Sequence, residues 1–95
     1  TWCWDFTMTA MNATRLGDPE KSVYELLMNK RTNTYLPNGH NYQDPRLRVY
    51  LPGNGGLLTA IALMCAGWDG CEIENPGFPK NGKWNVMWEG LSPMP

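Results

Sequence analysis

A polar segment in the middle of the chain carries side chains suited to hydrogen bonding. Asn38, His40, Asn41 and Gln43 lie around Tyr42. Each of the four offers a donor and an acceptor at short reach, which is what sugar hydroxyl groups require. His40 is the only histidine, and no Ser or Cys stands at a recognisable nucleophile elbow, so a catalytic triad has no support. The alternative is a surface turn whose histidine binds nothing.

A glycine-rich turn, Gly53-Asn54-Gly55-Gly56, is the second candidate, because it precedes an apolar segment with helical character. Backbone N–H groups at such a helix start suit an anion or a hydroxyl group. The turn lacks the Lys-Ser/Thr pair of a phosphate-binding loop and the spacing of a dinucleotide fingerprint. The alternative is that Asn54 caps the helix and the glycines permit close packing.

The five tryptophans leave two interpretations open. They are either core residues, which is the commoner role of this side chain, or flat platforms for the C–H face of a sugar ring. The acidic residues show no spacing that selects a catalytic carboxylate pair, so no catalytic residue is identified. The candidate substrate-binding residues are Asn38, His40, Asn41, Asn54 and Trp68.

Composition excludes several classes of function. A chain of 95 residues with 42% hydrophobic residues is one small folded domain rather than a disordered segment. The net charge of -1 argues against nucleic acid and anionic membranes as partners. The longest apolar run, residues 57–66, is about half a membrane span. Three irregularly spaced cysteines and one histidine predict neither a metal site nor a cofactor.

The elements that must position these residues begin with a helical hairpin. Apolar spacing predicts helices over residues 5–16 and 19–28. Gly17 suits the end of the first, and Asp18-Pro19 suits the start of the second. The second helix should present its apolar stripe to the core, and that stripe consists of Val23, Leu26 and Leu27.

The rest of the chain predicts a long loop, one further helix and an irregular tail. Residues 29–52 are rich in turn signals, and only Leu47, Val49 and Leu51 alternate as one short strand. The helix expected over residues 54–66 is apolar nearly all round, and two other helices cannot cover it. Either the chain oligomerises or it belongs to a larger parent, which the opening Thr1-Trp2, without a Met, also suggests. In the tail, Trp84, Val86 and Trp88 alternate as a strand.

Three segments carry a resemblance to a known family: MTAMNATRLGDPEKSVYELLMNKRTNTYLPNGHNYQ, YLPGNGGLLTAIALMCAGWDG and FPKNGKWNVMWEGL. Together they resemble the end of the catalytic domain of six-hairpin glycoside hydrolases, closest to the family-95-like group of fucosidases and galactosidases with its Bacteroidetes homologues. The resemblance implies an all-α fold, a fragment of an (α/α)6 toroid, with a partly β C-terminal tail. Residues 1–67 would form the toroid portion, and residues 68–95 would lead toward a β-domain.

The resemblance also implies a function. In the family, a turn like Gly53–Gly56 lies at the rim of the sugar pocket, and an Asp that activates water precedes it; this sequence has Pro52 there. The general-acid Glu would lie outside these residues. The implied partners are a carbohydrate substrate and the remainder of the glycosidase domain, in the periplasm or outside the cell. The rival interpretations are a non-catalytic carbohydrate-binding or structural protein, and a helical oligomer unrelated to sugars.

Overall fold

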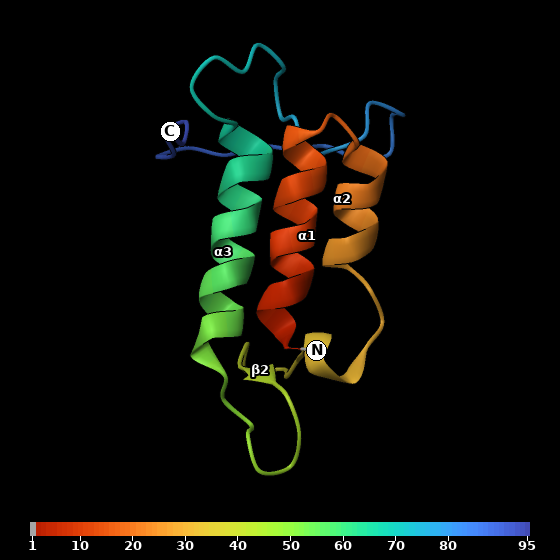
Figure 1. The fold of residues 1–95 in the computed structure, drawn as a ribbon, viewed down its shortest axis with the longest axis vertical. Helices are drawn as coiled ribbons and strands as arrows, with labels where there is room; N and C mark the ends of the chain where they lie inside the picture. Colours follow the sequence, from red (N-terminus) through yellow and green to blue (C-terminus); the bar gives the residue numbers. More distant parts are fainter. Residues whose placement is uncertain (1) are drawn as a thin grey trace.

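The computed structural model describes residues 2–95, in which three helices stand side by side above a small hairpin (Figure 1). α1 lies between the other two helices and packs against both. The elements in chain order are α1 (Cys3–Arg15), α2 (Pro19–Leu26), the 3-10 turn η1 (Arg31–Asn33), β1 (Thr34–Tyr35), β2 (Asn41–Tyr42) and α3 (Leu51–Ala66).

The predicted all-α fold, a fragment of an (α/α)6 toroid, is wrong. The chain forms a mixed structure of three helices and a two-stranded antiparallel sheet. The sheet pairs Thr34 with Tyr42 and Tyr35 with Asn41. The Asn38-Gly39 turn closes this hairpin, because Gly39 adopts a φ of +90° that favours glycine. Tertiary pairing therefore turns part of the predicted loop into a sheet.

The predicted strand at Leu47, Val49 and Leu51 is also wrong. Leu47 makes only an isolated bridge with Asp44, and Leu51 already belongs to α3. α3 begins earlier than the predicted start at residue 54, with Pro52 in its first turn, where the missing N–H has no helical partner to lose. Asn54 therefore lies within the helix and is not its cap, which is Tyr50.

The helical hairpin forms as expected, but the apolar stripe predicted for its second helix is only partly buried, with Val23 and Leu26 half-buried. Gly17 has a φ of +80°, and the Asp18 side chain accepts a hydrogen bond from the Lys21 N–H. The residue of α2 that is buried is Ser22, whereas Leu27 is 65% exposed. Ser22 Oγ donates to the Ala10 carbonyl at 3.1 Å, so a small hydroxyl side chain permits close approach of α1 and α2.

The contact between α1 and α3 is built from small side chains. A Cβ added at Gly56 would lie 2.6 Å from Thr7 Oγ1 of α1, and one added at Gly53 would lie 3.1 Å from Cys3 Cβ of α1 and overlap the Asn41 side chain of β2. Ala60 of α3 and Ala10 of α1 are both fully buried. The glycines of the predicted turn therefore lie inside the helix, where they let the two backbones approach closely.

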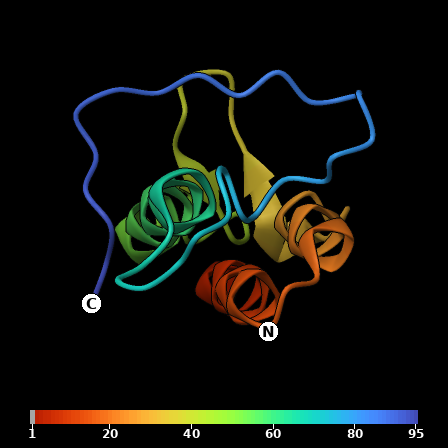
Figure 2. The same cartoon turned by 90° about the horizontal axis from the view of Figure 1, so that it is seen from above.

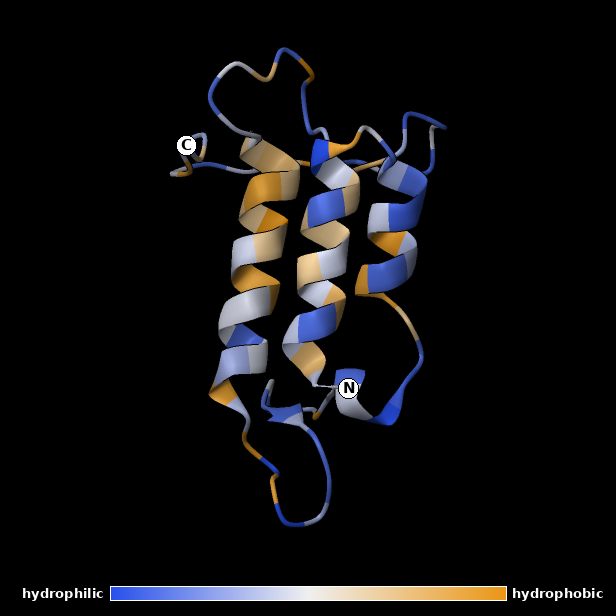
Figure 3. Cartoon of the chain, in the orientation of Figure 1, coloured by the Kyte–Doolittle hydropathy of each residue, from blue (hydrophilic) through white to orange (hydrophobic). Residues whose placement is uncertain are grey.

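As expected, two helices do not cover α3. Leu63 and Met64 are buried, but Leu58 is 70% exposed and Leu51 is 66% exposed. Figure 3 shows the upper half of α3 as the most hydrophobic helical surface of the molecule. The helix is apolar all round, so any neighbour on one side leaves apolar residues on the other.

The tail after Gly67 crosses the helices as an irregular segment (Figure 2). Gly77 packs directly on Met64, and its N–H donates to the Met64 carbonyl at 2.9 Å. Trp68 pairs with Met94 in an isolated bridge near the end of the chain. The predicted strand through Trp84 and Trp88 is absent from the described tail. No helix within residues 2–95 combines the length and hydropathy of a membrane span.

Two neighbouring glycines test the close approach of α1 and α3. We expect Gly56→Ala to lower the free energy of unfolding by about 1–3 kcal/mol, because its methyl group would meet Thr7 Oγ1. Gly55→Ala is the matched control, since a Cβ there meets nothing within 4 Å, and it should stabilise the helix by about 0.5–1 kcal/mol. Urea unfolding of both variants measures the difference, and equal effects would contradict the packing described.

Two leucines on α3 test which face is the core. Leu63→Ala should cost about 2–5 kcal/mol of unfolding free energy, because it leaves a cavity at a residue that is only 1% exposed. Leu58→Ala should change stability by less than about 0.5 kcal/mol, since that side chain is 70% exposed. Thermal or urea unfolding gives both values. A large cost at Leu58 would show that this face is covered in solution.

Candidate functional site

The hairpin end of the molecule brings together four of the five candidate residues. Asn38 and His40 lie in the exposed turn between the strands, where Asn38 Oδ1 accepts the His40 backbone N–H at 3.0 Å. Asn41 begins β2, and Asn54 lies in α3 beside it. The sequence therefore grouped these four correctly in space, although it did not predict what their side chains bind.

Asn54 joins α3 to the hairpin. Its Oδ1 accepts the Asn41 backbone N–H at 3.0 Å, and its Nδ2 donates to the Gly39 carbonyl at 2.9 Å. Both ends of the amide are thus used within the protein. Asn54 is a structural residue of the hairpin rather than a free ligand for a hydroxyl group.

Asn41 and Gln43 form a buried chain of amides under the hairpin. Both side chains are almost fully buried, at 0% and 2% exposure. Asn41 Nδ2 donates to the Thr34 carbonyl at 3.1 Å, and Gln43 Nε2 donates to Asn41 Oδ1 and to the Thr32 carbonyl, each at 2.7 Å. Gln43 Oε1 is buried and has no hydrogen-bond partner among the described residues.

A buried thiol and a half-buried phenol lie beside this amide chain. Cys3 Sγ lies 3.2 Å from Tyr35 Oη and 3.4 Å from Asn33 Oδ1, while Tyr35 Oη donates to the Gly53 carbonyl at 3.4 Å. Burial, with a smaller effect of Cys3, raises the pKa of Tyr35 far above its usual range. The phenol therefore stays neutral and acts as a hydrogen-bond donor. This pair holds α1, β1 and α3 together.

Trp68, the fifth candidate, lies apart from the other four. It follows Gly67 at the C-terminal end of α3, whereas Asn54 lies in the first turns of that helix. A helix of 16 residues is about 24 Å long, so Trp68 and the hairpin turn cannot hold one sugar ring together. The guanidinium carbon of Arg15 lies 5.3 Å from the centre of the Trp68 ring, a cation–π contact.

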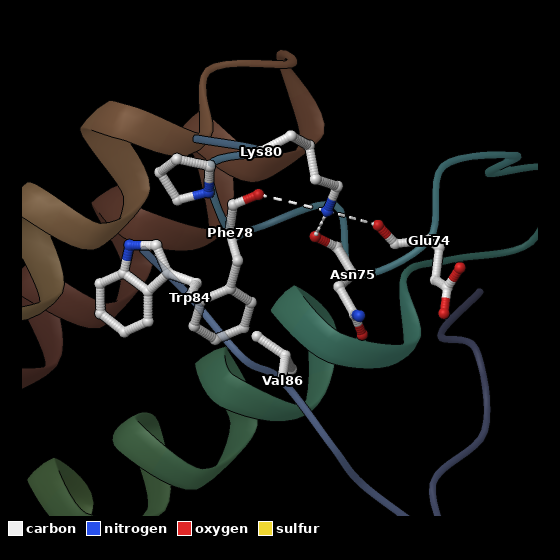
Figure 4. A pocket seen from close by; sticks show the side chains of 7 residues that line it. Glu74, Asn75, Phe78, Lys80, Trp84 and Val86 are labelled. Carbon is white, nitrogen blue, oxygen red and sulfur yellow. Dashed lines mark hydrogen bonds between the residues drawn. The ribbon is translucent and has the colours of Figure 1, made fainter. Parts of the chain in front are cut away.

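A hollow of about 310 Å³ in the tail is a site that the sequence-based candidates missed (Figure 4). Phe78 and Trp84 form its aromatic wall, with ring centres 5.4 Å apart and planes inclined by 50°. Polar groups lie across from this wall in Figure 4. The lining residues are Glu74, Asn75, Phe78, Lys80, Trp84 and Val86, with Pro79 beside them.

Lys80 and Asn75 give this hollow its shape. Lys80 Nζ donates to the carbonyls of Glu74, Asn75 and Phe78 at 2.6, 2.8 and 3.3 Å, which uses all three ammonium hydrogens. Asn75 has a φ of +48°, and its Oδ1 accepts the Trp88 indole N–H at 2.8 Å. The Lys80 ammonium group thus holds the turn closed, while Asn75 Nδ2 takes no part in these bonds.

The tryptophans are not core residues. Trp2, Trp4, Trp84 and Trp88 are 50%, 45%, 41% and 44% exposed, and Trp68 is partly exposed. The core instead consists of smaller side chains, such as Ala10, Ala60 and Leu63, together with Phe6. Of the two interpretations that the sequence left open, the structure supports exposed aromatic surfaces. The sequence signal for these aromatic surfaces was the number of tryptophans, which does not predict where each tryptophan lies in the fold.

Comparison of the chain with protein-family models, with curated proteins and with solved structures gave no match. The likeness to family-95 glycoside hydrolases therefore rests on the quoted segments alone. Within residues 2–95, no group of three or more His, Cys, Asp or Glu side chains is placed to hold a metal ion.

The two hydrogen bonds of Asn54 can be separated by substitution. Asn54→Ala removes both and should lower the unfolding free energy by about 1–3 kcal/mol. Asn12→Ala, on the exposed side of α1, is the control and should change it by less than about 0.5 kcal/mol.

Asn54→Asp keeps the acceptor but places a carboxylate against the Gly39 carbonyl. It should be destabilised at pH 7 and approach the wild type below roughly pH 4, where the protonated acid donates again. The variant gains stability as the pH falls, because the Gly39 carbonyl raises the pKa of the new carboxyl group in the folded state. Urea unfolding at both pH values measures this, and wild-type stability of Asn54→Asp at pH 7 would refute the donor role.

Proposed function

We propose that this chain binds carbohydrate, with the tail hollow as its main site. One observation carries the proposal: the tryptophans lie at the surface, and Trp84 forms with Phe78 the wall of a hollow that polar residues also line. Large exposed aromatic side chains cost a protein hydrophobic stabilisation, so their placement outside the core favours a role in binding.

The chemistry of the hollow suits a sugar ring. The face of a pyranose carries C–H groups that pack on an indole, and its rim carries hydroxyl groups that need donors and acceptors. Trp84 supplies the flat surface, and Asn75 Nδ2 supplies an amide donor. Lys80 does not compete for the ligand, because three carbonyls already hold its ammonium group.

The resemblance of the chain to six-hairpin glycoside hydrolases extends this proposal to an enzyme that acts on fucosides or galactosides. In that case this chain contributes binding, while the general acid lies in another part of the protein. The position where the family has an Asp holds Pro52, in the first turn of α3, so it offers no group that could activate water. The exposed apolar face of α3, with Leu51 and Leu58, supports packing against a remainder of the glycosidase.

Titration of the chain with galacto- and fuco-oligosaccharides, followed by calorimetry, tests the proposal. The wild type should bind at least one of them, and Trp84→Ala should weaken that binding by about fivefold or more, because about 1 kcal/mol of apolar burial is lost. Trp4→Ala is the matched control. Trp4 is also about half exposed, at 45%, but it lies on α1 outside the hollow.

Two results would contradict the proposal. Absence of binding to every oligosaccharide by a folded wild-type chain would remove the carbohydrate function. If Trp84→Ala and Trp4→Ala weaken oligosaccharide binding equally, the chain binds carbohydrate but the tail hollow is not the site.

A further inference from the structure

A second hollow, of about 250 Å³, lies at the base of the hairpin, away from the tail. Trp2 forms one part of its lining, and its ring stacks on Tyr50 with the ring centres 5.2 Å apart. Trp2 is 50% exposed, so its indole remains available to a ligand. The lining residues are Trp2, Arg31, Thr32, Gln43 and Asp44.

The amide chain fixes which atom of Gln43 has no partner. Asn41 must present its Nδ2 to the Thr34 carbonyl, because a carbonyl only accepts hydrogen bonds, so its Oδ1 faces Gln43. Gln43 must then present Nε2, which donates to Asn41 Oδ1 and to the Thr32 carbonyl. A flipped Gln43 amide would set oxygen against oxygen twice. The atom without a partner is therefore an acceptor.

An unpaired acceptor in this position calls for a donor. Gln43 is 2% exposed, and its Oε1 is the buried side-chain polar atom that lacks a partner in residues 2–95. Burial of a polar group without a hydrogen bond is costly, so most such groups in folded proteins are paired. Gln43 also lines the hollow, so the residue that carries the unpaired acceptor borders the space that a ligand would enter.

The other lining groups limit the nature of that donor. The charges of Arg31 and Asp44 balance, which favours a neutral ligand over an ion. Asp44 Oδ1 accepts the backbone N–H groups of Arg46 and Leu47, so one carboxylate oxygen is already used. The volume of 250 Å³ is at the small end for ligand sites, which suits one ring rather than a chain of sugars.

We infer that this hollow is a subsite for a single neutral sugar ring, which stacks on Trp2 and donates a hydroxyl hydrogen to Gln43 Oε1. The identity of the ligand rests on the proposed carbohydrate function, while the need for a donor rests on the amide chain alone. Because Oε1 is buried, a small displacement of the lining side chains accompanies binding. The hairpin end would then hold one sugar unit and the tail hollow another.

The experiment uses nitrogen-15-labelled chain titrated with D-galactose and L-fucose and observed by NMR. The Gln43 side-chain amide and the Trp2 indole N–H should shift together and saturate. They should shift equally in Trp84→Ala, which alters only the tail hollow. Trp2→Ala should weaken this binding by about fivefold or more, whereas Trp4→Ala, its matched control on α1, should leave it unchanged.

The outcomes separate this inference from the proposed function. If the tail resonances respond to sugar while those of Gln43 and Trp2 do not, the hairpin subsite is refuted and the carbohydrate function stands. If neither the tail resonances nor those of Gln43 and Trp2 respond, both the carbohydrate function and the hairpin subsite are refuted. An internal water that contacts the Gln43 amide and is unchanged by sugar would supply the missing donor and overturn the inference.

Discussion

The close approach of α1 and α3 is the constraint on which the rest of the structure depends. It requires glycine at two positions of α3, because a side chain at Gly56 would meet Thr7 of α1 and one at Gly53 would crowd Cys3 of α1. The space beside Gly53 is also filled by the Asn41 amide of β2. The carbonyl of Gly53 also accepts the hydrogen bond of Tyr35. The same helical turn thus sets the spacing of the helices and anchors the hairpin.

A buried polar network lies under the hairpin, against Gly53 of α3. The Asn41 amide lies directly against Gly53, so amide side chains fill the space between α3 and the strands. Asn41, Gln43 and Asn54 satisfy one another and the nearby backbone, as buried polar groups must. The exception is Gln43 Oε1, and the residue Gln43 lines a hollow. The buried amide network and the proposed hairpin subsite therefore share the residue Gln43.

A core of small residues also determines the surface. Ala10, Ala13 and Ala60 contribute little area, and the hydroxyl groups of Thr14 and Ser22 bond to each other inside the helical hairpin at 2.7 Å. The tryptophans and one face of α3 lie outside this interior. Both features are typical of surfaces that bind other molecules. The tail hollow is the place where two aromatic rings and polar groups face a common space.

Local signals in the sequence determined the helices and the turns between them. Gly17 with Asp18-Pro19 closed the helical hairpin, and Asn38-Gly39 marked a turn, because these residues act through their own backbone preferences. Only the tertiary structure decided which faces are buried. Leu27 has the side chain of a core residue, yet it is 65% exposed, whereas Ser22 is buried and bonds to the Ala10 carbonyl of the neighbouring helix. Likewise, Asn54 has the residue type of a cap, but its partners, Asn41 and Gly39, come from another part of the chain. Periodicity describes one element at a time, whereas partners and exposure depend on what the fold brings against it.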